Sequence, residues 1–563
     1  MSNSKVKYSL NKSGEFIIES YNFAKPFASF FPGIAGLYGI PMWVFYVNRG
    51  QGVISFGTED KNHSIAEFLP ASKAWQYASS QGFRTFLKIK TNREVVYYEP
   101  FQDTVDNLSF DIKRKMKIKS YELVLEEINN TLGVGIEVKY FTLPNEPIAG
   151  LIRELRITNL GKKALDFEVV DGLPRIVPYG TSNFFLKKMG RTIEAWMRVD
   201  FLRDSIPFYN LSVDPSDRPE TSFIKGGNFY LAFVNKNKKP KLLKTIVDPF
   251  CLFGSGDFSY PRSFINKLKF NPSTNKQVKE SKTPCAFSFS KFILSPKKSE
   301  TISSVIGYAH SKDKLNGAVN KILVHDFIAD KQKENKKIIN EIEESVWTKS
   351  GFLEFDLYAR QTYLDNTLRG GYPVSFDTDK GKDVFYLYSR KHGDLERDYN
   401  NFVLDPTYFS QGNGNYRDMN QNRRSDNWFN SDVLESNITN FFNLIQTDGF
   451  NPLVVKGMSF LINPDEKRKL LKDIKRSIDA EKVSQVLSES FSPGALSMFI
   501  EDNNIELNVS LQEFLQKTLS LSSAVEEADH CEGFWTDHWT YNLDLIENYL
   551  SLYPEKLKEL LID

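Results

Sequence analysis

The residues best suited to chemistry lie in a short Gly-rich segment. Positions 412–426 read GNGNYRDMNQNRRSD, which places an aromatic residue directly before the adjacent pair Arg417 and Asp418. Arg carries a planar fork of donors and Asp carries paired acceptors, so together the two side chains can grip neighbouring hydroxyl groups from both sides. The alternative is an Asx-type turn with a solvated Arg–Asp pair. These residues alone leave both interpretations open.

A second segment gathers aromatic rings around a carboxylate. Residues 528–544 read ADHCEGFWTDHWTYNLD, with Trp535 and Trp539 on either side of Asp537 and His538. Aromatic faces cover the C–H surface of a sugar while a carboxylate accepts its hydroxyl groups, so this combination is typical of a sugar subsite. A helix start packed with aromatic side chains is the alternative interpretation.

Other chemistries are disfavoured. A zinc site built from His530, Cys531 and His538 matches no standard ligand spacing and has no evident fourth ligand, so no metal is predicted. The charged stretch 389–402, SRKHGDLERDYNNF, is either an active-site loop or a charged helix terminus. The sequence contains no P-loop, dinucleotide fingerprint, G-x-S-x-G or H-E-x-x-H motif, so no cofactor is predicted.

The charge balance and the cysteines narrow the class of protein. Lys and Arg total 72 and Asp and Glu total 71, so nothing favours a nucleic-acid partner. The three cysteines, an odd number at wide spacing, argue against a disulfide framework and fit a reducing compartment. The sequence lacks the apolar core of a secretory signal and a run of the roughly 18 apolar residues that a membrane span needs. It therefore predicts a soluble, cytoplasmic protein with no membrane partner.

The positions of these segments depend on the elements around them. The chain has 563 residues, too many for one hydrophobic core, so several domains are expected. Residues 1–311 contain many short, β-branched or aromatic runs bounded by turn residues, such as 43–47, 53–57 and 151–159. This pattern predicts an antiparallel β-sandwich domain.

The pattern becomes helical beyond residue 311. Residues 312–347 predict a charged helical linker, and 348–563 predict an all-helical domain. Asn463-Pro464 is typical of a helix start, predicted to extend to Ile478, and Ser510 with Glu513 matches a capping box. The stretch 539–553 is apolar on nearly two faces and therefore wants neighbours on both sides.

Taken together, GNGNYRDMNQN followed by EGFWTDHWTYNLDLIENYL resembles glycoside hydrolase family ninety-four, the inverting β-glucoside phosphorylases. The similarity is greatest to β-1,2-oligoglucan phosphorylases and the phosphorylase module of cyclic β-1,2-glucan synthases. The family motif is aromatic-Arg-Asp-x-x-Gln-Asp, which here runs from Tyr416 to Asn422, with Asn422 in place of the usual Asp. The resemblance implies an N-terminal β super-sandwich, a helical linker and part of an (α/α)6 barrel.

The resemblance also implies an activity. Inorganic phosphate, as co-substrate, would attack β-linked glucooligosaccharides, with β-1,2 linkages preferred, to give α-glucose 1-phosphate. The implied substrate-binding residues are those of the two segments, namely Arg417, Asp418, Gln421, Trp535, Asp537, His538 and Trp539. The alternatives are an inverting hydrolase on the same scaffold and a non-catalytic glucan-binding protein. Phosphate dependence separates the phosphorylase from the hydrolase.

One departure from the family pattern concerns the general acid. In relatives it lies well downstream of the segment matching FWTDHW, and residues 348–563 show only about half of the helical patterns that an (α/α)6 barrel needs. The resemblance therefore implies an acid beyond residue 563 and a chain that corresponds to the N-terminal half of a phosphorylase, which a complementary C-terminal chain would complete. Asp537 is the stand-in acid within the chain.

Overall fold

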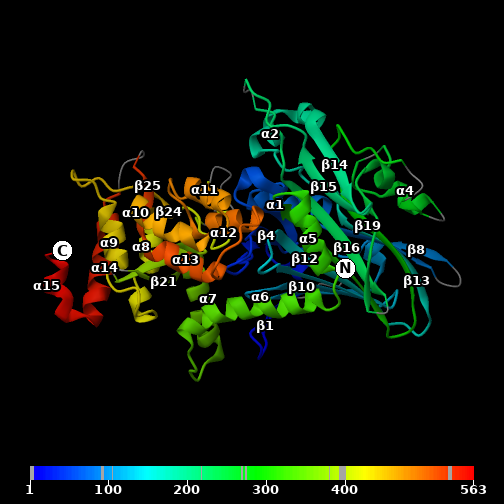
Figure 1. Cartoon of the computed structure of the whole chain (residues 1–563). Helices are drawn as coiled ribbons and strands as arrows, with labels where there is room; N and C mark the ends of the chain where they lie inside the picture. Colours follow the sequence, from blue (N-terminus) through cyan, green and yellow to red (C-terminus); the bar gives the residue numbers. More distant parts are fainter. Residues whose placement is uncertain are drawn as a thin grey trace. The chain divides into compact units, whose positions relative to one another are not determined.

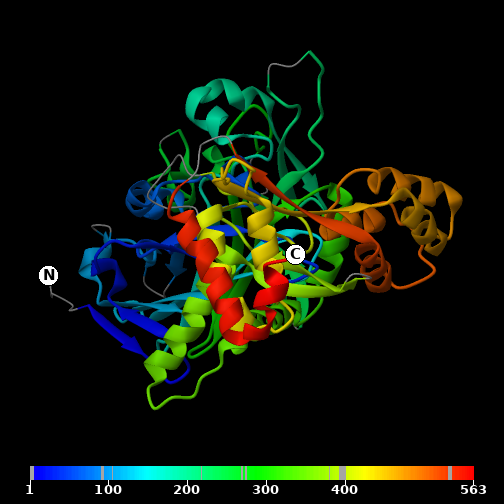
Figure 2. The same cartoon turned by 90° about the vertical axis from the view of Figure 1, so that its left-hand side faces the viewer.

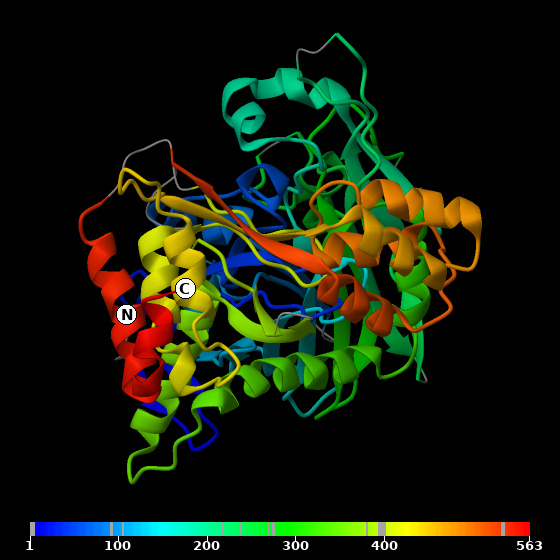
Figure 3. The same ribbon diagram turned by 60° about the vertical axis from the view of Figure 1, so that its left-hand side comes forward.

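The computed structural model describes residues 6–90, 94–103, 106–216, 219–236, 238–255, 257–267, 270–272, 276–378, 381–391, 401–530 and 535–562. The chain folds into two compact units. Unit 1 contains Met1–Ala35 and Met42–Lys337, and unit 2 contains Gly36–Pro41, Ile338–Gly393 and Asn401–Asp563. Figures 1, 2 and 3 show the chain from three sides, with unit 1 mainly blue to green and unit 2 mainly yellow to red.

Unit 1 is built around a large antiparallel sheet. Its strand order is β1 (Lys7–Leu10), β2 (Phe16–Glu19), β9 (Ile112–Ile118), β10 (Leu123–Asn129), β11 (Val134–Thr142), β12 (Ala149–Asn159), β20 (Ser299–Ala309), β16 (Gly227–Lys236), β15 (Ile206–Leu211) and β14 (Met197–Leu202), with β17 (Lys239–Leu242) beside β16. Long strands with alternating burial, such as β11, leave one face for the core. The prediction of antiparallel β-structure is confirmed.

Two smaller antiparallel sheets complete unit 1. One has the order β18 (Thr245–Ile246), β19 (Ala286–Leu294), β13 (Leu165–Leu173), β7 (Arg84–Lys90) and β8 (Val95–Tyr98), and the other β3 (Ala28–Phe30), β4 (Trp43–Val47), β5 (Val53–Gly57) and β6 (Ser64–Ala66). The helices of this unit are α1 (Ala71–Gln81), α2 (Asn183–Lys188), α3 (Phe250–Phe253), α4 (Arg262–Asn266) and α5 (Lys312–Ile322). α6 (Phe327–Glu343) begins in unit 1 and ends in unit 2.

Apolar side chains join the helices of unit 1 to its sheets. Leu315 and Val319 of α5 pack with Ile152 and Val305 of the large sheet in one buried cluster. α3 and α4 contribute to a second cluster with Phe86 of β7. Removing this apolar surface from water is the main stabilising contribution to such a core.

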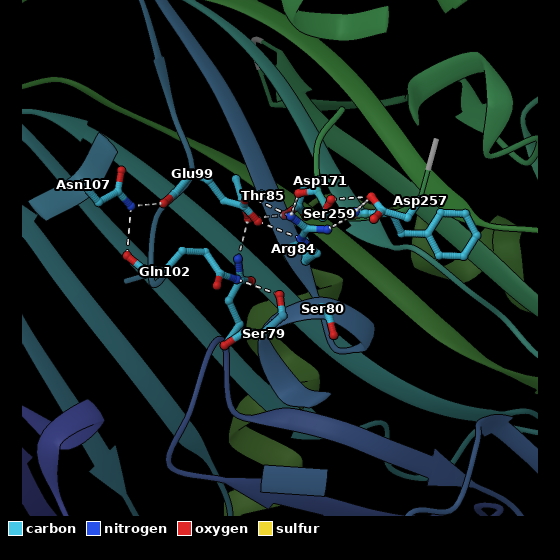
Figure 4. A network of polar contacts seen from close by, with 12 residues as sticks. Ser79, Ser80, Arg84, Thr85, Glu99, Gln102, Asn107, Asp171, Asp257 and Ser259 are labelled. Atoms are coloured by element: carbon cyan, nitrogen blue, oxygen red, sulfur yellow. Dashed lines mark hydrogen bonds and ion pairs between the residues drawn. The ribbon is translucent and has the colours of Figure 1, made fainter. Parts of the chain in front are cut away.

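Buried polar side chains connect the sheets of unit 1 (Figure 4). Arg84 on β7 donates from Nε and Nη2 to the two carboxylate oxygens of Glu99, at 2.7 and 2.9 Å. The neighbouring Thr85 donates to Asp171 on β13 at 2.7 Å. Asp171 also pairs with Arg153 on β12, and both of these side chains are fully buried. A buried charge is costly unless it is paired, so each ion of this pair depends on the other.

Unit 2 is mainly helical. Its helices are α7 (Leu353–Gly370), α8 (Tyr416–Arg423), α9 (Ser436–Asn443), α10 (Pro464–Leu470), α11 (Ser477–Val486), α12 (Pro493–Asp502), α13 (Leu511–Ser520), α14 (His538–Leu552) and α15 (Leu557–Leu560). α8 contacts α7, α9 and α14, and α14 lies beside α9 (Figures 1 and 2). The predicted capping box at Ser510 and Glu513 starts α13 as expected.

The prediction of an all-helical region beyond residue 348 is wrong. β21 (Tyr372–Thr378) pairs with β22 (Gly381–Leu387), and β24 (Val454–Ile462) lies between β23 (Gly414–Asn415) and β25 (Ser522–Asp529). α10 to α13 lie in the sequence between β24 and β25, at one end of this strand pair (Figure 3). The long helix predicted from Asn463 to Ile478 also stops at Leu470, because Ile474 forms a β-bridge with Leu507.

Among the described residues, no helix has both the length and the apolar character needed to cross a membrane. Cys251 and Cys285 are buried, and neither forms a disulfide with a described residue.

Candidate functional site

The Gly-rich segment forms a strand-to-helix turn in unit 2. The short strand β23 pairs with Val454 and Val455 of β24, and α8 starts directly afterwards at Tyr416. A Cβ atom on Gly414 would lie 2.4 Å from Cγ and Sδ of Met419, so only glycine lets the strand pass this close to the helix. The turn therefore places Arg417 and Asp418 in the first turn of α8.

Arg417 lies near two carboxylates from distant parts of the sequence. Its Nε donates to Oδ1 of Asp418 at 3.2 Å, and its Nη1 lies 3.9 Å from Oδ2 of Asp537. Asn415 holds the second carboxylate oxygen of Asp418, donating to it at 3.0 Å. The side chains of Arg417, Asp418 and Asp537 are 43%, 30% and 44% exposed, so a ligand in solution can reach them. The structure thus brings the two predicted segments together.

One carboxylate oxygen of Asp537 has no hydrogen-bond donor among the described residues. The residue precedes α14 and its side chain makes no capping hydrogen bond. Its Oδ1 is buried and accepts no hydrogen bond from the residues that the structure describes. A buried acceptor left without a donor is costly.

Buried amides fix α8 against α14 beneath this surface. The hydroxyl oxygen of Tyr416 lies 3.0 Å from both Oδ1 of Asn542 and the carbonyl oxygen of Phe441. Asn420, one turn further along α8, donates to the same Asn542 oxygen at 2.5 Å. The side chains of Tyr416, Asn420 and Asn542 are almost wholly buried. These bonds set the register between the two helices and so the separation of Arg417 from Asp537.

His538 packs against Tyr416, the residue that precedes Arg417. Its ring stacks on Tyr416, with centroids 4.9 Å apart, and its Nδ1 lies 2.7 Å from Oδ1 of Asn451. Burial lowers its pKa below the usual value, so the ring is neutral at pH 7 and donates its Nδ1 proton to Asn451. The structure gives His538 a packing role, and direct contact with a sugar stays a prediction.

The remaining predicted site residues lie on the surface of unit 2. Trp535 precedes α14 and Trp539 is in its first turn, and both side chains are largely exposed. Gln421 is exposed on α8, one turn beyond Arg417. Asn422 donates back to the carbonyl oxygen of Asp418 at 2.7 Å, which uses its amide inside the helix. Sugar contacts by Trp535, Trp539 and Gln421 stay predictions.

The described part of the chain contains no group of three or more His, Cys, Asp or Glu side chains that could hold a metal ion. Nε2 of His530 lies 2.8 Å from the carbonyl oxygen of Leu444. Cys531 falls outside the described residues, as do positions 392–400 of the charged stretch 389–402.

A buried polar cluster at the end of α8 escaped the sequence analysis. Asp426 accepts a hydrogen bond from the hydroxyl of Tyr386 at 2.9 Å, and Asn437 donates to that same hydroxyl at 2.7 Å. The guanidinium of Arg423 lies 3.7 Å from the centroid of the Tyr386 ring. Burial raises the pKa of Asp426 to about 7. Only Arg423 and Asp426 are neighbours in the sequence, so no local pattern indicates the cluster.

No protein-family model and no curated protein sequence matches the chain. A solved bacterial glucoamylase in complex with acarbose aligns with 91% of this chain and 69% of its own, at 10% identity and a TM-score of 0.34. A polysaccharide lyase aligns with 50% of this chain and 34% of its own, at 11% identity and a TM-score of 0.26. A protein described as a kojibiose phosphorylase from the human microbiome aligns over 62% and 32%, at 9% identity and a TM-score of 0.21. Similarities of this size do not establish a common fold.

Proposed function

We propose that unit 2 binds a glucosyl residue of a β-linked glucooligosaccharide, with β-1,2 linkages preferred, and that the protein takes part in the inverting phosphorolysis of these glucans. The observation that carries the proposal is the position of Arg417 between Asp418 and Asp537 on an exposed surface. A fork of donors flanked by two acceptors matches the alternating hydroxyl groups of a sugar ring. The exposed rings of Trp535 and Trp539 would cover its C–H faces.

In the proposed reaction, a phosphate oxygen bonds to the anomeric carbon as the glycosidic C–O bond breaks. The leaving oxygen takes a proton from an acid, and the product is α-glucose 1-phosphate. Phosphate is already an anion, so no protein base is required, unlike in inverting hydrolases, where a second carboxylate activates water. Arg417 and Asp418 would hold the glucosyl ring, while Asp537 would either contact the sugar or supply the proton.

The proposal includes a scaffold. We assign α7, α8, α9 and α14 to part of an (α/α)6 barrel whose mouth carries the Arg417 site. The contacts of α8 with α7, α9 and α14 support this arrangement. In this assignment α8 and α14 each contribute one of the two motifs from neighbouring positions.

The direct test uses the purified chain and sophorose, a β-1,2-linked glucose disaccharide. We expect saturable binding of sophorose. If the chain supplies the general acid, we also expect phosphate release when α-glucose 1-phosphate is added. Release by this chain that is abolished in Asp537→Asn, while sophorose binding persists in that variant, would assign the acid to Asp537. Binding without release would indicate that this chain does not supply the acid.

Two results would overturn the proposal. Free glucose released from the glucan in phosphate-free buffer would identify a hydrolase. Failure to bind sophorose at millimolar concentration, in a chain whose folding has been verified by circular dichroism, would remove the sugar site itself.

A further inference from the structure

A cavity in unit 1 has no part in the function proposed for unit 2. It has a volume of about 680 Å³ and is open to solvent, and its charged side chains are exposed. It is bounded by Phe201 of β14, by Asp204 in the following turn, by Lys244 and Thr245, and by residues 276–280. β14 is the last strand of the large sheet, so the cavity lies at a sheet edge.

The segment 276–280 is held firmly at this edge. Val199 of β14 donates to the carbonyl oxygen of Lys279 at 2.8 Å. The side-chain oxygen of Gln277 accepts the backbone N–H of Val247 at 2.7 Å, and its amide donates to the carbonyl oxygen of Thr245 at 3.3 Å. Lys276 and Lys279 therefore lie close to the fixed Gln277 in the sequence, and both line the cavity.

The turn that supplies Asp204 is strained. Arg203 and Asp204 have φ values of 50° and 55°, in the left-handed region that residues other than glycine rarely adopt. The side chain of Arg203 holds the turn to α5, with Nε 2.9 Å from Oδ1 of Asn316 and Nη2 2.6 Å from Oδ1 of Asn320. Such strain persists where the surrounding structure imposes it, and it is frequent at binding sites.

Three positively charged side chains line the cavity. Lys244, Lys276 and Lys279 line it, and none of them forms an ion pair with any residue in the described part of the chain. Nearby Lys282, by contrast, lies 2.5 Å from a carboxylate oxygen of Asp248. With the two carboxylates of Asp204 and Glu280, the three lysines leave the lining with a net positive charge, which would attract a bound anion.

The other lining groups suit a sugar. Asp204 and Glu280 also make no ion pair with described residues, so their carboxylates are open to hydroxyl groups. Phe201 supplies an aromatic side chain at the wall, and the ammonium group of Lys279 lies 4.7 Å from the centroid of its ring. We propose that this cavity is a second ligand site, which binds a small sugar carrying a phosphate or carboxylate group. The proposal stands independently of the reaction proposed for unit 2.

Calorimetric titration of the whole chain with α-glucose 1-phosphate, glucuronate and glucose tests the proposal. We expect saturable binding of at least one of the two anionic sugars, weaker binding at high salt, and no competition by glucose. Lys244→Ala combined with Lys279→Ala should weaken binding by about tenfold or more, because each charge-assisted bond contributes strongly. Lys73→Ala on α1, an exposed lysine away from the cavity, is the matched control.

The variant Arg417→Ala distinguishes the two sites. It should leave the affinity of the cavity for the anionic sugar unchanged, whether or not unit 2 binds sophorose. Lys276→Glu, at an exposed position, provides a second variant that reverses a charge, and equal melting temperatures verify folding. Binding that is insensitive to both lysine variants, or no binding of either anionic sugar, would refute the site. A comparison of the affinities for α-glucose 1-phosphate and glucuronate shows whether the lysines prefer a phosphate or a carboxylate group.

Discussion

Arg417 lies between two carboxylates, and this position makes it both a donor to a ligand and a bridge between two segments. Its bond to Asp418 is local, whereas its approach to Asp537 joins α8 to the start of α14. Exposed ion pairs contribute little to stability. The three side chains are therefore better explained by ligand binding than by stabilisation of the fold.

Arg417→Ala should abolish most of the affinity for sophorose while leaving the fold intact. The lost charge-assisted hydrogen bonds contribute about 1.5–3 kcal/mol each, which corresponds to a tenfold or greater rise in Kd. Titration calorimetry measures the change. Arg468→Ala on α10, which removes an exposed arginine paired with Asp465 at 3.7 Å, is the control. Equal affinities in the two variants would argue against the assigned role.

Asp426 should make unit 2 less stable as the pH rises. Burial raises its folded pKa to about 7, above the ordinary value of 3.8, so the folded state binds the proton more tightly than the unfolded state. Stability from this group is therefore full below about pH 4 and is lost as the pH rises towards 7. Arg423 and the hydroxyl of Tyr386 face the carboxyl group and oppose part of this shift.

Asp426→Asn should flatten this dependence. Melting temperatures of the variant and the native chain, measured between pH 4 and 8, should differ progressively in favour of the variant as the pH rises. A difference that stays constant across this range would mean that Asp426 is ionised in the folded state throughout.

Secondary-structure elements that depend on short-range sequence signals were predicted well. β4 and β5 have the predicted bounds, because each is an apolar run closed by turn residues around Gly50 and Gly52. The capping box of α13 is equally local. Such features depend on neighbours within a few residues, so one sequence suffices to indicate them.

Elements formed by distant partners were missed. β25, with the sequence SSAVEEAD, is polar and acidic and has little intrinsic strand preference. It forms because its backbone pairs with β24 from Ser522 to Asp529. The candidate site likewise contains features that a local pattern indicates and features that depend on distant partners. The Arg–Asp pair could be recognised locally, but the bonds of Tyr416 and Asn420 to Asn542 depend on the tertiary contact of α8 with α14.

Asn542→Leu should therefore loosen the site as well as the fold. The buried Asn420 amide would lose its acceptor, at a cost of about 1–3 kcal/mol, whereas the Tyr416 hydroxyl would keep the carbonyl oxygen of Phe441. We expect a lower melting temperature together with weaker sophorose binding. Asn548→Ala on the same helix removes an acceptor for exposed Trp428 and a donor to the carbonyl oxygen of Asp544, and should change both quantities much less. Unchanged sugar affinity in Asn542→Leu would show that the α8–α14 contact does not position Arg417.

At the scale of the whole molecule, the two units have separate cores. Unit 1 buries apolar clusters between sheets and α3, α4 and α5, whereas unit 2 has a core of its own around Tyr416, Phe441 and Leu545. Each unit also has its own buried polar network, centred on Arg153 and Asp171 in unit 1 and on Asn542 in unit 2. Units with independent cores need not unfold together.

Differential scanning calorimetry should accordingly resolve two transitions, and variants should move them one at a time. Arg153→Met leaves Asp171 buried without its partner, at a cost of about 3–5 kcal/mol, and should lower only the transition of unit 1. Asn542→Leu should lower only the transition of unit 2, and sophorose should raise that same transition, because a ligand stabilises the state to which it binds. An anionic sugar bound at the lysine-lined cavity should raise the transition of unit 1 instead. A single transition that both variants lower by the same amount would show that the units unfold as one body, and the assignment of each ligand to one unit would then need a spectroscopic probe within that unit.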